Sequence, residues 1–113
     1  MWLFSEIGFF SAVENIHDPK TVLVRARFKA DIVALSKYGR SLGLKIPPAT
    51  ETPENDYRFR IIIRKTTWAD LVGRLAERID YSNFKNHVHG DPARDRAYMR
   101  CWSAMREAQS SEP

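Results

Sequence analysis

Apolar and polar residues alternate along two segments of the chain, and this period of two predicts β-strands with one buried face. The apolar positions of residues 21–28 and 57–65 that share a face are Val22, Val24, Ala26 and Phe28, and Tyr57, Phe59, Ile61 and Ile63. Residues 2–14 are largely apolar and aromatic, with Gly8 in their middle. They form either one strand with a bulge at Gly8 or a hairpin that turns over residues 5–8.

Helical spacing of apolar residues predicts three or four helices, over residues 30–38, from Thr67 onward and from Pro92 to about 108, with a short one over 81–88. Thr67 and Asp70 resemble a capping box, and the stripe that follows contains Trp68, Leu71, Val72, Leu75 and Ile79. Asp91 before Pro92 is typical of a helix start. We expect the last helix to bury Ala97, Cys101, Ala104, Met105 and Ala108. Three prolines in residues 45–56 predict a loop.

This order of elements predicts an α+β fold, in which helices pack on one face of a small antiparallel sheet. A ferredoxin-like arrangement is the nearest named architecture. No linker or internal repeat divides the chain, so we expect one domain over residues 1–109 and a frayed tail over 110–113.

The charge of the chain is concentrated in its middle. The net charge is +4, but residues 20–65 contain eleven lysines and arginines against four acids, a balance of +7. Such a segment favours an anionic partner. The chain has a single cysteine, Cys101, and no apolar run of transmembrane length, so we expect a cytoplasmic protein without a membrane partner.

If helices cover one face of the sheet, the other face collects the basic residues. The arginines that alternate with the apolar positions are Arg25, Arg27, Arg58, Arg60 and Arg64. The first strand adds Trp2, Phe4, Phe9 and Phe10, some of which must point to this other face, and of these we expect Trp2, Phe4 and Phe10 to contribute to binding. Arginine forks suit phosphate, and aromatic rings stack on bases. We therefore predict a non-catalytic binding protein without a cofactor, whose partner is an acidic protein or a nucleic acid.

Two alternatives use other residues. His87, His89 and Asp91 are metal-ligand types close in sequence, and they would suit a small metal-dependent enzyme. Alternatively, the chain is a homodimer whose sheet face or aromatic N-terminus is the interface. No phosphate loop, dinucleotide fingerprint or paired-carboxylate motif is present.

Two stretches carry a resemblance to known sequences. They are Trp2-Leu3-Phe4 with Gly8-Phe9-Phe10-Ser11, and the later segment 80–85, which reads Asp-Tyr-Ser-Asn-Phe-Lys. Together they resemble a group of short bacterial proteins of unassigned function. The resemblance spans most of the chain and implies that the two motifs belong to one fold. It implies no activity.

Overall fold

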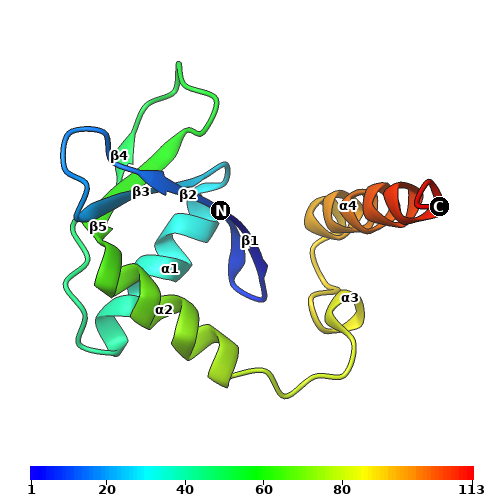
Figure 1. The fold of residues 1–113 in the computed structure, drawn as a ribbon. Helices are drawn as coiled ribbons and strands as arrows, with labels where there is room; N and C mark the ends of the chain where they lie inside the picture. Colours follow the sequence, from blue (N-terminus) through cyan, green and yellow to red (C-terminus); the bar gives the residue numbers. More distant parts are fainter. The chain divides into compact units, whose positions relative to one another are not determined.

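Five antiparallel strands form one sheet, in the order β1-β2-β3-β5-β4. The structure is a computed structural model that describes residues 1–113. Its strands are β1 (Trp2–Ser5), β2 (Gly8–Glu14), β3 (Thr21–Ala26), β4 (Thr50–Glu51) and β5 (Phe59–Arg64). Its helices are α1 (Lys29–Ser41), α2 (Lys65–Glu77), α3 (Phe84–His87) and α4 (Pro92–Ser110). The predicted α+β class is therefore confirmed (Figure 1).

Packing divides the chain into two compact units, residues 1–79 and residues 80–113. The first unit contains the whole sheet with α1 and α2, and the second contains α3 and α4. The first motif of the resemblance lies in the β1–β2 hairpin, and the second opens the second unit. None of the four helices combines the length and the apolar character that a membrane-spanning segment needs.

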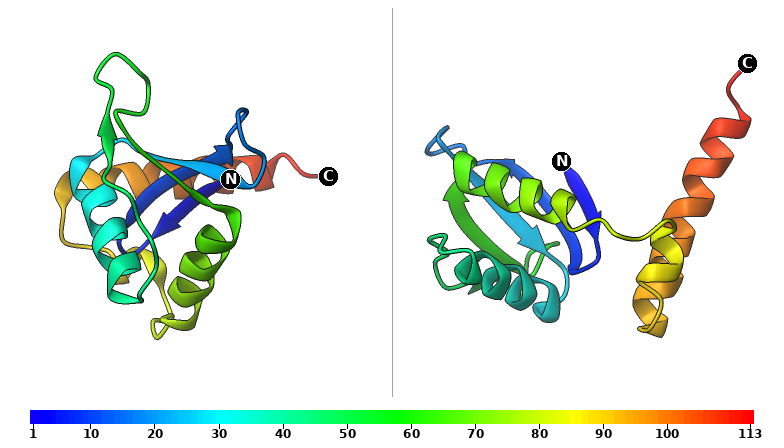
Figure 2. Two further views of the ribbon diagram at one scale, coloured as in Figure 1. Left: turned by 90° about the vertical axis from the view of Figure 1, so that its left-hand side faces the viewer. Right: turned by 90° about the horizontal axis from the view of Figure 1, so that it is seen from below.

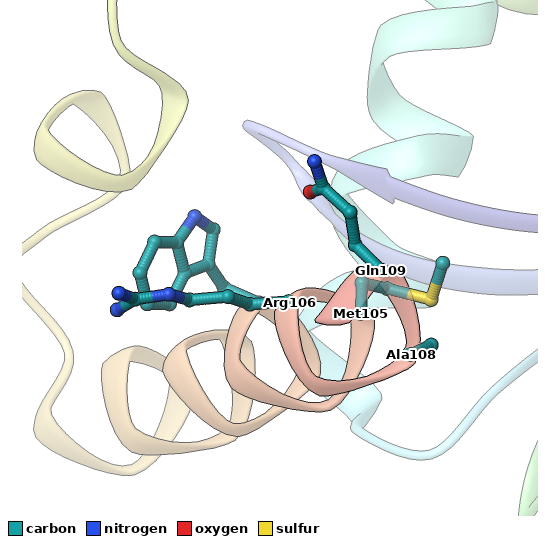
Figure 3. A pocket seen from close by; sticks show the side chains of 5 residues that line it. Met105, Arg106, Ala108 and Gln109 are labelled. Atoms are coloured by element: carbon teal, nitrogen blue, oxygen red, sulfur yellow. The ribbon is translucent and has the colours of Figure 1, made fainter. Parts of the chain in front are cut away.

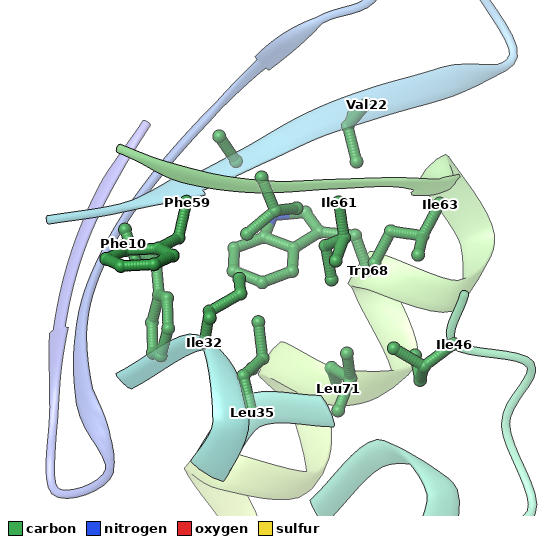
Figure 4. Close-up of a cluster of buried hydrophobic side chains, with 13 residues drawn as sticks. Phe10, Val22, Ile32, Leu35, Ile46, Phe59, Ile61, Ile63, Trp68 and Leu71 are labelled. Atoms are coloured by element: carbon green, nitrogen blue, oxygen red, sulfur yellow. The ribbon is translucent and has the colours of Figure 1, made fainter. Parts of the chain in front are cut away.

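Helices α1 and α2 pack on the same face of the sheet, and the hydrophobic core lies between them and the strands (Figures 2 and 4). The two predicted strands supply its sheet side, with Val22, Val24, Ala26, Phe59, Ile61 and Ile63 all buried. Ile32 and Leu35 of α1 and Trp68 and Leu71 of α2 close it from the helix side. Alternation along the strands therefore assigned these side chains to the correct face.

The first segment is a hairpin, which decides between the two alternatives for residues 2–14. Strands β1 and β2 pair with Ser5 opposite Gly8, and the Ser5 hydroxyl donates to the Gly8 carbonyl over 2.8 Å. Gly8 has a φ of +147°, and its backbone runs directly over the buried carboxyl group of Asp31. That carboxylate accepts the Phe9 N–H over 3.1 Å, so it joins the hairpin to the first turn of α1.

Four local predictions need correction. Phe28 lies beyond the end of β3 and is exposed. Helix α2 begins at Lys65 and has no side-chain cap, so Thr67 and Asp70 lie inside the helix and form no capping box. Ile79 was expected on the apolar stripe of this helix, but it lies beyond the end of α2 and is exposed. The predicted loop contains a short edge strand, β4, which pairs with β5.

The second unit corrects a larger prediction. Asp91 does cap α4, accepting the N–H groups of Ala93 and Arg94. Tyr98 is buried, with its ring stacked on Phe84 of α3 at a centroid distance of 5.8 Å. The residues expected to be buried are all exposed, namely Ala97, Cys101, Ala104, Met105 and Ala108. The four-residue helix α3 is too short to cover a 19-residue neighbour.

Replacing Gly8 with alanine should lower the free energy of unfolding by about 2–4 kcal/mol. A Cβ atom at this position would lie 2.5 Å from Cγ of Asp31, and the positive φ disfavours any side chain. Urea denaturation measures the loss. The loss should shrink only in part in an Asp31→Ala background, because this change removes Cγ and Oδ2 but keeps the Cβ atom of residue 31, which would lie 2.7 Å away.

Gly73→Ala is the matched control, because Gly73 lies in α2 and a Cβ atom there would meet no other atom within 4 Å. It should raise stability by about 0.5–1 kcal/mol. Equal effects of the two substitutions would contradict the role given to Gly8.

Candidate anion-binding face

The side chains that point away from α1 and α2 form what we call the open face of the sheet. The register places Trp2 opposite Ser11, Ser11 opposite Arg25, and Arg25 opposite Arg60. Because paired residues share a face, these four side chains form one row across β1, β2, β3 and β5. Arg25 lies between the buried Val24 and Ala26 in sequence, which fixes the row on the open face.

Arg25 and Arg60 are half-buried cations without an acidic partner. Arg25 donates to the Ser11 hydroxyl over 2.9 Å, and Arg60 donates to the Tyr57 carbonyl over 3.1 Å. The Nε atom of each is buried and has no hydrogen-bond partner. Neither arginine has a carboxylate within ion-pair distance. Two like charges directly opposite on a sheet repel, so an anion bound between them would stabilise this arrangement.

The ring of Tyr57 packs against the guanidinium groups of Arg25 and Arg27. Its ring lies 4.6 Å from the Arg25 guanidinium carbon and 4.2 Å from that of Arg27, both as cation–π contacts. Its ring centroid is 6.4 Å from that of Phe9. The alternation in residues 57–65 grouped Tyr57 with the core residues, but β5 begins only at Phe59. Tyr57 is buried under the arginines instead of under the helices.

Aromatic side chains continue the open face along the β1–β2 hairpin. The rings of Phe4 and Phe9 stack at 4.4 Å, and Trp2 meets the edge of Phe9 at 6.2 Å. Trp2 is 70% exposed. The placements predicted for Trp2 and Phe4 agree with this geometry, whereas Phe10 is 0% exposed and packs in the core. Phe10 alternates with Phe9 along the strand, so Phe9 is the aromatic residue of β2 on the open face.

The remaining predicted arginines differ in their surroundings. Arg27 forms an ion pair with Asp56 at 2.9 Å, and this hydrogen bond raises the pKa of the Arg27 guanidinium above its usual value. Arg64 lies opposite Thr21 and is exposed, and Arg58 is exposed just before β5. Asp56 thus neutralises one of the five arginines, whereas Glu6 forms an ion pair with Arg78.

The side chains of His87, His89 and Asp91 do not converge on one point. The His87 ring stacks on Tyr81 at 4.2 Å, and the Nδ1 atom of His89 lies 3.0 Å from Oδ2 of Asp95. Asp91 is occupied as the cap of α4. No group of three or more histidine, cysteine, aspartate or glutamate side chains is placed to hold a metal ion. The geometry therefore gives the metal-dependent alternative no site.

Sequence reasoning missed Ser11 and Tyr57 of the open face, and it selected Phe10 in place of Phe9. Phe9 and Ser11 were detectable only through the register of the hairpin, because a shift of one residue exchanges the faces. Tyr57 had no sequence signal, since its position depends on where β5 begins.

Replacing Tyr57 with leucine should lower the free energy of unfolding by about 1–3 kcal/mol, because the ring that supports both guanidinium groups is removed. Tyr57→Phe keeps the ring and should cost less than about 1 kcal/mol. Urea denaturation gives the two stabilities. The Nε–H resonances of Arg25 and Arg27 should lose their ring-current shifts in the leucine variant alone. Unchanged resonances there would show that the guanidinium groups do not rest on the ring.

Comparison of the chain with protein-family models, curated proteins and solved structures finds no match.

Proposed function

We propose that the chain binds single-stranded nucleic acid on the open face of its sheet. The observation that carries the proposal is the half-buried pair Arg25 and Arg60, which lacks a carboxylate partner and shares its row with the exposed Trp2. One row thus offers cations for a phosphate and an aromatic ring for a base.

The two arginines are ordered before a ligand arrives. Ser11 and the Tyr57 carbonyl each hold one guanidinium by a hydrogen bond, and Tyr57 supports Arg25 from its ring face. Holding the side chains in place reduces the entropy that binding would otherwise cost. A phosphate accepts several hydrogen bonds from arginine forks, and partial burial strengthens the interaction.

The aromatic rings favour unpaired bases. Stacking needs an accessible ring face, which a duplex does not offer except at its ends. Trp2 lies at the outer end of the row with most of its surface exposed, and Phe4 and Phe9 lie beside it. We expect one base to stack on Trp2 while the adjoining phosphate reaches the arginine pair.

An acidic protein is the second candidate partner, and one observation favours it. The row next to the arginines is apolar, with Val13 opposite Leu23 and Leu23 opposite Ile62. Ile62 is exposed, which suits a protein interface. A homodimer through this face is less favourable, because a two-fold axis would bring a second unpartnered arginine pair toward the first.

Reversing the charge of Arg58 and Arg60 to glutamate should weaken binding of a fluorescent single-stranded oligonucleotide by about tenfold or more. Fluorescence anisotropy at two salt concentrations measures the effect. The slope of log affinity against log salt should fall by about 0.7 for each phosphate that the variant no longer neutralises. The fold should survive, because the new glutamate at position 60 would face Arg25.

Lys37→Glu with Lys45→Glu is the matched control, since it also reverses two charges, one on α1 in the helical layer and one in the loop that follows α1. It should reduce affinity much less. If the wild-type chain binds no nucleic acid even at low salt, the proposal is wrong and the acidic protein becomes the leading candidate.

Trp2→Ala should lower affinity for single strands by about 1–3 kcal/mol, the usual contribution of one stacked base. Affinity for a duplex should change little, because duplex binding depends on charge alone. Trp102→Phe, in the second unit, is the control for the loss of an indole. Equal losses for single strands and duplexes would contradict a stacking role for Trp2.

A further inference from the structure

Helix α4 presents an apolar face that the rest of its unit leaves uncovered. Its exposed residues Ala97, Cys101, Ala104 and Ala108 follow one another at intervals of four, three and four positions. This spacing places them along one line of the helix, as in the seam of a coiled coil. Met105 borders the line and is 71% exposed. Exposure of so much apolar surface to water is unfavourable, so the face favours a partner.

A hollow on the flank of α4 does not explain this face. Trp102, Met105, Arg106, Ala108 and Gln109 line it, all from the same helix (Figure 3). The Trp102 ring already holds the Lys85 ammonium at 4.0 Å and the Arg106 guanidinium at 5.4 Å. The hollow is therefore a shallow groove beside the apolar line, formed by one exposed helix.

The charges beside the apolar line indicate which partner packs on it. Arg100 and Glu107 both lie on one edge of the line, seven residues or about two turns apart. Neither forms an ion pair within its unit. The other edge carries Tyr98 and Met105, which are apolar or aromatic. One edge is thus charged with both signs, and the other is uncharged.

We infer that α4 pairs in antiparallel fashion with α4 of a second copy of the chain. A two-fold axis between Cys101 and Ala104 places Cys101 opposite Ala104 of the other copy, and Ala97 opposite Ala108. The same operation keeps each edge on its own side, as in antiparallel coiled coils. Arg100 of each copy then meets Glu107 of the other, twice by symmetry. On the other edge the exposed Met105 borders the seam, while Tyr98 is covered by α3.

The alternatives fit these charges less well. A parallel pair would place the charged edge of each helix beside the uncharged edge of the other, so Arg100 and Glu107 would gain no ion pair. A membrane surface would leave Glu107 facing anionic headgroups at the edge of the apolar line. Small side chains along the seam allow the two helices to approach closely, which increases their packing interactions. This inference is independent of the proposed function.

The experiment is a charge exchange followed by sedimentation equilibrium over a range of protein concentrations. The wild-type chain should dimerise. Arg100→Glu alone and Glu107→Arg alone should each weaken the dimer by about tenfold or more, because each makes both ion pairs repulsive. An equimolar mixture of the two variants should regain dimers, since every such pair in the heterodimer is again between opposite charges. The double variant should dimerise by itself.

Arg106→Glu is the control, because Arg106 lies on the face of α4 opposite the apolar line. It should leave the dimer intact. Circular dichroism of each variant verifies that the helix persists. A wild-type chain that stays monomeric at every concentration would overturn the inference. So would a dimer that responds to none of the single reversals, since its interface would lie elsewhere.

Discussion

The pairing of β3 with β5 is the constraint on which the rest of the structure depends. Six residue pairs join these central strands, from Thr21 opposite Arg64 to Ala26 opposite Phe59. Helix α1 connects them in sequence and packs on the face where their valines and isoleucines lie. A shift of one residue in this register would expose Val24 and Ile61 and bury the arginines. Burial of the core and presentation of the arginines are thus two results of one register.

The same constraint explains how much could be predicted from the sequence. Alternation along residues 21–28 and 57–65 assigned the core side chains of the two strands correctly, because burial of one face leaves a periodic signal. It also assigned Arg25 and Arg60 to the opposite face. It gave no information on which strands are neighbours, so the direct opposition of these two arginines needed the structure. The order of the sheet places β5 beside β3, although α1 and β4 lie between them in sequence.

Errors occurred where packing overrides local pattern. Phe9 and Phe10 are chemically equivalent in sequence, and only the turn of the hairpin decides which one faces the core. Gly8 sets that turn, since Asp31 occupies the space where a side chain would lie. The apolar line of α4 has a clean helical period, and this period predicted burial. A periodic pattern shows that an apolar face favours burial. It does not show whether the surface that buries this face belongs to the same chain.

Desolvation links the two exposed surfaces of this protein. On the sheet, partly buried guanidinium groups have given up water without gaining a carboxylate, so an anion is the ligand that would restore their interactions. On α4, apolar side chains remain in water beside charges that have no partner in their unit. The open face of the sheet therefore requires an anion, whereas α4 requires an apolar surface with charges opposite to its own. A strand of nucleic acid provides phosphates and bases but no apolar ridge, whereas an antiparallel copy of α4 provides that ridge and the opposite charges. For this reason we assign the two surfaces to two different partners.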